Sequence, residues 1–220
     1  MTAQIREYFA KAMSILEEEG LLLQSSSELP DVSRIISTQR TSGSWWTDPM
    51  ASKIFAVSEM LSDHPDVTLT KLVSGKVTLV HRRLWSRLVA IGKARDDWQT
   101  QSLSPDAQLL LREVDKSGSL RTDQLGYEGK FGKKPGTTAL ELELRLLIHS
   151  EQFHTETGYH TKLLETWDVW STRMKLRSKA IEPWRAQHFF EKRLEELNEK
   201  YGARAELPWQ SKKLLKVKRT

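Results

Sequence analysis

The hydrophobic pattern at the start of the chain is helical. Apolar residues stand at positions 5, 8, 9, 12, 13 and 16, which is the spacing of one helix face, and Gly20 is placed to end the helix. Residues 24–44 are mostly polar and contain Pro30 and Gly43, so they predict a loop with one short helical turn. Residues 1–44 are therefore expected to form an N-terminal helical arm and loop.

Residues 45–100 predict a helix–hairpin–helix unit. Asp48 stands before a proline, which favours a helix start, and the helix should end shortly before the next proline. Apolar and polar residues then alternate on both sides of Ser74-Gly75, a pattern typical of a β-hairpin. The segment RRLWSRLVAIGKARDDW follows as the second helix.

Residues 101–170 predict a winged helix-turn-helix domain. Ser104 is placed to cap a first helix that ends at Gly118, the segment SLRTDQLG is expected as a short second helix, and TTALELELRLLIH as the third. The loop GYEGKFGKKPG joins the last two. The stretch HSEQFHTETGYHTKLLETW then predicts the hairpin wing, with a three-residue turn at 156–158.

The third helix of this domain is poor in the side chains that read bases. Its core face is expected to hold Leu140, Leu144, Leu147 and Ile148, and its outward face Thr138, Glu141, Arg145 and His149. A helix that enters the major groove normally offers several Arg, Lys, Asn or Gln side chains. Because this helix offers one arginine with glutamates beside it, we expect it to recognise base edges only weakly.

The last part of the chain, residues 171–220, predicts charged helices divided at Pro183 and a basic tail, KKLLKVKRT. The expected fold class is mainly α with small β-hairpins (α+β). It combines a winged helix-turn-helix and a helix–hairpin–helix unit with flanking helices.

Charge and composition narrow the function classes. Net charge is +5, and the basic excess lies in residues 67–134 and 171–220. Two such zones can attract phosphates, although solvated lysine-rich helices would give the same composition. No apolar run approaches the roughly 18 residues of a membrane span. The absence of cysteine excludes disulfides and thiol catalysis, so a cytoplasmic protein without membrane contact is expected.

Two segments supply candidate side chains for nucleic-acid contact, and the wing and third helix add the rest. In GKFGKKPG, lysines stand next to glycines that permit close approach of an anion, and in VSGKVTLVHRRLWSR cations alternate with an aromatic ring that can stack on bases. The alternative for the first segment is a solvated loop. The alternative for the second is that its cations are charges at the start of a helix and lie above a buried Trp85. The candidate set is Lys76, Arg82, Arg83, Arg87, Lys130, Lys133, Lys134, Arg145, His154, His160 and Lys162.

The wing histidines also suggest a metal site. His154 and His160 would face each other across the hairpin, with His149 or Glu151 available as a third ligand. No established spacing such as HExxH is present, so neither a metal nor another cofactor is expected. No GxSxG context occurs either, so no catalytic residue is assigned and enzymatic activity is left open.

Trp45-Trp46 places two large rings side by side in the sequence. One ring is expected in the core, and the other as a surface anchor for a protein partner or for the N-terminal arm.

The run LLLREVDKSGSLRTDQL…TTALELELRLLIHSEQFHTETGYHTKLLETW resembles a winged-helix module of AlkZ-type bacterial DNA glycosylases. Gly118, Leu120, Leu125, the Leu140-Glu141-Leu142 triplet and the wing at 151–164 stand in comparable places. The resemblance implies a winged-helix fold and DNA as partner. The Gln-apolar-Asp motif on which that family's catalysis depends is missing, so no catalytic residue is carried over. The segment GSWWTDP…TKLVSGKVTLVHRRLW is similar to a bacterial family that implies no particular activity.

Three functions are consistent with these patterns. The favoured one is a nucleic-acid binding protein of winged-helix type, with DNA as the preferred partner and phosphates as the main contacts. The second is a glycosylase-like enzyme with a non-standard site near Trp45, Trp46 or Trp85. The third is a protein-interaction module in which the C-terminal helices cover the third helix of the winged helix.

Overall fold

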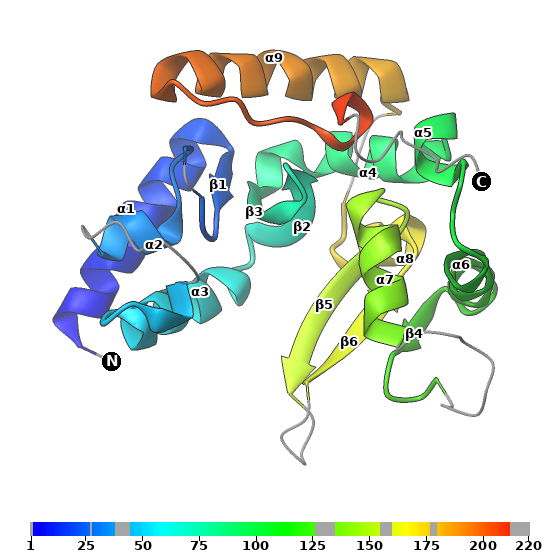
Figure 1. The fold of residues 1–220 in the computed structure, drawn as a ribbon, viewed down its shortest axis with the longest axis horizontal. Coiled ribbons are helices and arrows are strands. Elements are labelled where there is room, and N and C mark those ends of the chain that lie inside the picture. Colours follow the sequence, from blue (N-terminus) through cyan, green and yellow to red (C-terminus); the bar gives the residue numbers. More distant parts are fainter. Residues whose placement is uncertain are drawn as a thin grey trace. The chain divides into compact units, whose positions relative to one another are not determined.

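The chain has a mixed α+β fold that divides into two compact units. Unit 1 comprises Met1–Trp85 and Phe189–Leu207, and unit 2 comprises Ser86–His188 and Pro208–Thr220. Each contains a three-stranded antiparallel sheet in the part of the chain that the structure describes. This computed structural model, drawn in Figure 1, describes residues 2–26, 28–37, 45–125, 135–154, 160–176 and 180–211.

Unit 1 alternates helices and strands before its hairpin (Figure 1). Its sheet has the order β1-β3-β2, so the last strand lies in the middle. The elements are α1 (Ala3–Glu19), β1 (Leu21–Leu23), α2 (Val32–Ile36), η1 (Trp45–Thr47), α3 (Ala51–Ser62), β2 (Val67–Val73), β3 (Lys76–His81) and η2 (Arg82–Leu84).

The core of unit 1 joins its first and third helices to the sheet. Ala12 and Leu16 of α1 belong to one buried cluster with Ile54 and Val57 of α3 and Leu79 of β3. Burying one large aliphatic side chain contributes about 1.5–3 kcal/mol. Helix α1 is therefore part of the core of unit 1, and the expected boundary at 44/45 does not coincide with the boundary of either unit.

Unit 2 has its own sheet, of order β4-β6-β5. Helix α4 (Trp85–Ala94) leads the chain into this unit, and α9 (Pro183–Tyr201) leads it back into unit 1. A second core cluster includes Leu110 of α6, Leu142 of α7 and Leu164 of β6. The other elements are α5 (Asp97–Thr100), α6 (Pro105–Ser117), β4 (Ser119–Arg121), α7 (Pro135–Leu144), β5 (His149–His154), β6 (His160–Glu165), α8 (Trp167–Arg173) and η3 (Pro208–Gln210).

The two units share an arrangement in which a helix and a first strand are followed by helical structure and then a hairpin, with α2 and α3 between strand and hairpin in unit 1 and α7 among the described residues of unit 2. In both, the sheet order is first strand, third strand, second strand. The likeness extends to single atoms. Gly20 ends α1 with φ 79°, and Gly118 ends α6 with φ 76°. The carbonyl of Gly20 accepts the N–H of His81 at 3.0 Å, and that of Gly118 accepts the N–H of Thr166 at 2.9 Å. The end of the third strand is thus fixed to the glycine that ends the preceding helix, α1 in unit 1 and α6 in unit 2, in the same way.

Several local predictions are confirmed. The Ser104 side chain accepts the N–H of Ala107 and caps α6, and Gly118 ends that helix. The turn at Ser74-Gly75 joins β2 to β3, with φ values of 50° and 67°. Such paired positive φ angles match the twist of a two-residue hairpin turn.

The prediction of a short helix at SLRTDQLG is wrong for residues 119–125, the part of this segment that the structure describes, because none of them is helical. Ser119–Arg121 form β4, in which Leu120 pairs with Leu164 of β6. Ladder hydrogen bonds to a strand more than forty residues further along the chain override the local preference. Residues 126–134, with the predicted loop lysines, lie outside the described part of the chain.

Candidate nucleic-acid interface

Helix α7 does not have the outward face predicted for it. Leu140, expected in the core, is 37% exposed, whereas Thr138, Arg145 and His149 are buried. The helix ends at Leu144, and Leu146 adopts a positive φ of 52°, so the following residues do not continue its faces. The outward face of α7 therefore differs from the one that helical periodicity suggested.

Arg145 holds the end of helix α5. Its Nη1 donates to the carbonyl oxygens of Trp98 and Gln101, each at 2.9 Å, and to that of Gln99 at 3.4 Å. Burial lowers the pKa of this guanidinium, while Glu141 acts in the opposite direction. A buried cation that satisfies the last carbonyls of a helix has a structural role, which removes Arg145 from the candidate phosphate ligands.

The carboxylates of α7 also contact the protein itself. Glu141 accepts the backbone N–H of Ser104 at 2.8 Å and its hydroxyl at 2.7 Å, which fixes the start of α6. Glu143 accepts from Lys162 of β6 at 2.5 Å. Lys162, a predicted nucleic-acid ligand, is therefore part of an ion pair that joins strand β6 to helix α7.

His149 is buried at the start of β5, the first strand of the hairpin. Its ring stacks on Trp170 with centroids 4.7 Å apart and meets the edge of Trp167 at 5.6 Å. Burial opposes ionisation of the neighbouring Glu165, but hydrogen bonds from His149 and Arg173 outweigh it and lower the pKa of Glu165. This buried cluster anchors the hairpin to α8, and it leaves His149 no position on an outward helix face.

Arg82 and Arg83 have partners within unit 1. Arg82 donates to the carbonyl of Pro65 at 3.2 Å and lies over the ring of Trp85, 5.1 Å from its centroid. Arg83 donates to the carbonyl of Glu18, the end of α1, at 2.8 Å. Trp85 is fully buried and donates to the carbonyl of Val80. Arg82 and Arg83 therefore match the alternative given for this segment, in which the cations are charges at the start of a helix and lie above a buried tryptophan.

His81 precedes these arginines and caps η2. Its Nδ1 accepts the N–H of Arg83 at 3.5 Å. Burial lowers the pKa of His81, and the charge of Arg83 lowers it further. A histidine in this setting favours its neutral form, so it adds no stable positive charge to the segment.

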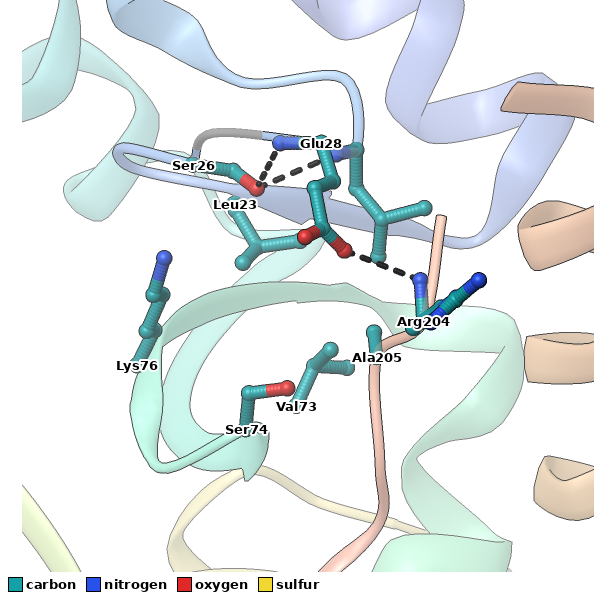
Figure 2. A pocket seen from close by; sticks show the side chains of 9 residues that line it. Leu23, Ser26, Glu28, Val73, Ser74, Lys76, Arg204 and Ala205 are labelled. Carbon is teal, nitrogen blue, oxygen red and sulfur yellow. Dashed lines mark hydrogen bonds between the residues drawn. The ribbon is translucent and has the colours of Figure 1, made fainter. Parts of the chain in front are cut away.

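Lys76 is exposed and lines a small cavity of unit 1 (Figure 2). The cavity, of about 150 Å³, also receives Ser26, Ser74, Glu28 and Arg204. Ser26 Oγ accepts the N–H of Glu28 at 3.1 Å, and Glu28 accepts the N–H of Arg204 at 2.9 Å. The space has room for a few water molecules or one small anion, but not for a nucleotide.

The turn of the first hairpin is bound to the C-terminal part of unit 1. Ser74 donates its N–H to the carbonyl of Glu206 at 2.8 Å, and the N–H of Glu206 donates to Ser74 Oγ at 3.2 Å. Asn198 fixes this segment further, through two hydrogen bonds with the backbone of Ala205. The hairpin of unit 1 is therefore less accessible to a partner than a free wing would be.

An aromatic patch lies where α3 begins, consisting of Trp45, Trp46 and Phe55. The two tryptophan rings stack with centroids 3.9 Å apart, and Trp46 is 5.9 Å from Phe55. Trp45 packs against the core of unit 1, whereas Trp46 is 61% exposed and Phe55 39% exposed. The prediction of a surface ring is confirmed for Trp46, whereas Trp45 is only partly buried against the core.

The remaining predicted ligands are Arg87, which the structure describes, and five residues that lie partly or wholly outside the described part of the chain. Arg87 lies half-buried in α4. Lys130, Lys133, Lys134 and the side chains of His154 and His160 lie outside the described residues, as does the metal alternative built on the two histidines. Among the side chains that are described, no three His, Asp or Glu residues are grouped as metal ligands would be.

Comparison with known proteins gives no relative for this chain. No family model, no curated protein and no solved structure matches it. Within the described residues, none of the helices is both long and apolar enough to cross a bilayer.

Proposed function

We propose that this protein binds nucleic acid, DNA in particular, through two winged-helix units in tandem. The observation on which the proposal depends is the repeated topology, in which the third strand lies between the first and the second in both sheets. Winged helices share this order, with the hairpin as the wing and the helix before it as the recognition helix. By that correspondence the recognition helices are α3 and α7.

The contacts are to phosphates more than to base edges. Helix α7 contains no Lys or Arg, and in α3 the only cation, Lys53, hydrogen-bonds to Gln4 at 2.7 Å. Lys133 and Lys134 directly precede Pro135, the first residue of α7, in the sequence. A helix N-terminus next to lysines favours phosphate. The proposed contacts are Lys76, Arg87, Lys130, Lys133, Lys134, His154 and His160.

The sequence favours a protein that binds DNA and does not excise bases from it. The resemblance to AlkZ-type glycosylase modules concerns the scaffold, and the Gln-apolar-Asp motif is missing from the chain. Two further predicted cations, Arg82 and Arg83, contact carbonyl groups of unit 1, which leaves fewer side chains for a base pocket beside Trp85.

The test is a binding measurement on the full chain with a fluorescent duplex of random sequence. The double variant Lys133→Ala, Lys134→Ala is expected to bind about tenfold more weakly, and to lose the same factor on duplexes of different sequence. Lys192→Ala, which removes an exposed lysine of α9, is the matched control and should bind as the parent does. Equal affinities for all three proteins would contradict the proposal.

A second function, a protein-interaction module, has one observation in its favour. Phe55 exposes apolar surface on the proposed recognition helix of unit 1 and Trp46 exposes it beside that helix, where a DNA-binding protein usually places polar groups. Under this alternative the Trp46→Ser variant loses a protein partner, and its duplex affinity does not change. Affinity purification with the parent and the variant, read by mass spectrometry, distinguishes the two.

A further inference from the structure

The helix that precedes the first strand, α1 in unit 1 and α6 in unit 2, ends with the same local backbone contacts in both units. The glycine carbonyl is bound by the N–H of His81 in unit 1 and of Thr166 in unit 2. Leu84 and Val169, respectively, lie three residues further along the chain. A Cβ added to Gly20 would lie 2.8 Å from Leu84, and one added to Gly118 would lie 2.9 Å from Val169. The two helix ends can therefore be compared residue by residue, with Glu18 equivalent to Lys116.

In unit 1 this helix end is covered by α9. Arg193 donates to the carbonyl of Glu19 at 2.8 Å and also pairs with its carboxylate. Lys200 and Tyr201 donate to Glu19 Oε1 at 2.6 and 3.1 Å. Glu19 is only 3% exposed as a result. The covering element is thus a helix whose cations match the acidic end of α1, Glu17–Glu19.

In unit 2 the equivalent place is an open groove of about 530 Å³. It lies among α4, the end of α6 and the start of α8, and Val169, 37% exposed, lines it. Two ion pairs border it, Lys93 with Asp168 and Arg95 with Asp115. All of the lining residues belong to unit 2.

The charge of the helix end differs between the units. Where α1 ends in three glutamates, α6 ends in Asp115, Lys116 and Ser117. The groove therefore contains three cations, Lys93, Arg95 and Lys116, against two carboxylates. Lys116 is exposed, and within the described part of the chain it has no ion-pair partner, so it is available to an anionic group.

We propose that this groove binds an amphipathic helix of a partner protein, with acidic side chains directed at Lys116 and an apolar side chain on Val169. The helix occupies on α6 the place that α9 occupies on α1. Glu19 is equivalent to the uncharged Ser117, so the charges are reversed at one position. There Lys200 pairs with Glu18 at 3.4 Å in unit 1, and an acidic side chain would pair with Lys116 in unit 2. The inference rests on the internal repeat and on charge complementarity. It is independent of the proposed binding of nucleic acid.

The test uses two labelled synthetic peptides and the full chain. One peptide has the sequence of α9, Pro183–Tyr201, and the other has the same sequence with Arg193→Glu and Lys200→Glu. Fluorescence polarisation is expected to give at least about tenfold tighter binding of the charge-reversed peptide, because only that peptide matches the groove. Amide shifts in NMR spectra should concentrate at Gly118 and Val169.

Two protein variants locate the binding site. Lys116→Glu is expected to weaken binding of the charge-reversed peptide about tenfold, whereas Lys192→Glu, the same change at an exposed lysine of α9, leaves it unchanged. Both positions are exposed, so both variants should fold, and far-UV circular dichroism checks this. No binding, equal binding of both peptides, or equal effects of both variants overturns the proposal. A loss of duplex DNA affinity in Lys116→Glu with unchanged peptide binding also overturns it, because the groove would then contact phosphate.

Discussion

Glu19 is a buried carboxylate that receives three donors from one helix, Arg193, Lys200 and Tyr201. Burial alone would raise its pKa, but the hydrogen bonds from Lys200 and Tyr201 and the charge of Arg193 outweigh burial and lower it. Such a carboxylate stabilises the fold while it is ionised, because two of its partners, Arg193 and Lys200, are cations for which it is the most buried counter-charge. The side chain of Glu19 therefore helps to hold residues 189–207 against the rest of unit 1.

The variant Glu19→Gln is expected to lower the free energy of unfolding by about 2–3 kcal/mol at pH 7, as measured by urea denaturation. The acid dependence should change as well. Because the folded pKa of Glu19 lies below its ordinary value of 4.5, its contribution is complete above that pH and is lost as pH falls through the folded pKa. The variant should therefore lose less stability than the parent between pH 5 and 3. Glu17→Gln, at an exposed position of the same helix, is the control.

A second prediction at the residue scale separates structure from recognition at Arg145. Arg145→Lys keeps the charge but replaces the planar guanidinium with a shorter side chain that ends in a point-like ammonium group. It should not reach the carbonyls of Trp98, Gln99 and Gln101 with the same geometry, so it should lower stability by about 1–3 kcal/mol. Affinity for a random duplex, measured where the variant is fully folded, should stay within about twofold. A marked loss of affinity in the folded variant would return Arg145 to the proposed interface.

At the scale of elements, α4 and α8 pack so closely that one position admits only hydrogen. A Cβ on Gly92 would lie 2.2 Å from Trp167 Nε1 and 2.4 Å from two further atoms of that ring. The same indole donates to the carbonyl of Leu146 at 2.7 Å, so it is held in place and cannot easily move aside. The contact between the two helices therefore depends on the absence of a side chain.

Gly92→Ala is accordingly expected to destabilise unit 2 by about 2–4 kcal/mol, in spite of the higher helix propensity of alanine. The matched control is Gly136→Ala in α7, where an added Cβ meets nothing within 4 Å and alanine should stabilise by up to about 1 kcal/mol. Thermal unfolding followed by circular dichroism gives both values. Similar melting temperatures for the two variants would show that α4 and α8 adjust to the methyl group.

Elements were predictable from the sequence where their signals are local. Ser104, Gly118 and the Ser74-Gly75 turn lie within or beside the elements they define, so periodicity and capping rules located them. Strand β1 was missed because its three residues acquire strand structure only by pairing with Thr78–Val80. The faces of α7 were misassigned because they depend on where the chain leaves the helix, and the partners of Arg145 lie 44–47 residues away.

For the whole molecule, the main finding is one arrangement used twice with different surroundings. In unit 1 the helix end is covered by α9 and the hairpin turn is bonded to Glu206, whereas in unit 2 the equivalent helix end borders an open groove. The sequence did not reveal this repeat, because the two copies share topology and a few backbone contacts but little residue identity. The binding residues were only partly predictable for a related reason. A sequence does not show whether an arginine is exposed to solvent or bound to other groups of the same protein.

The most direct test of the central claim, binding of nucleic acid through phosphates, is a salt titration of the parent protein with a fluorescent duplex of random sequence. If several lysines displace counterions, the logarithm of the association constant should fall linearly with the logarithm of salt concentration, with a slope of about −3 to −5. An affinity that does not change between about 50 and 200 mM salt, or no binding at the lower concentration, would contradict the account.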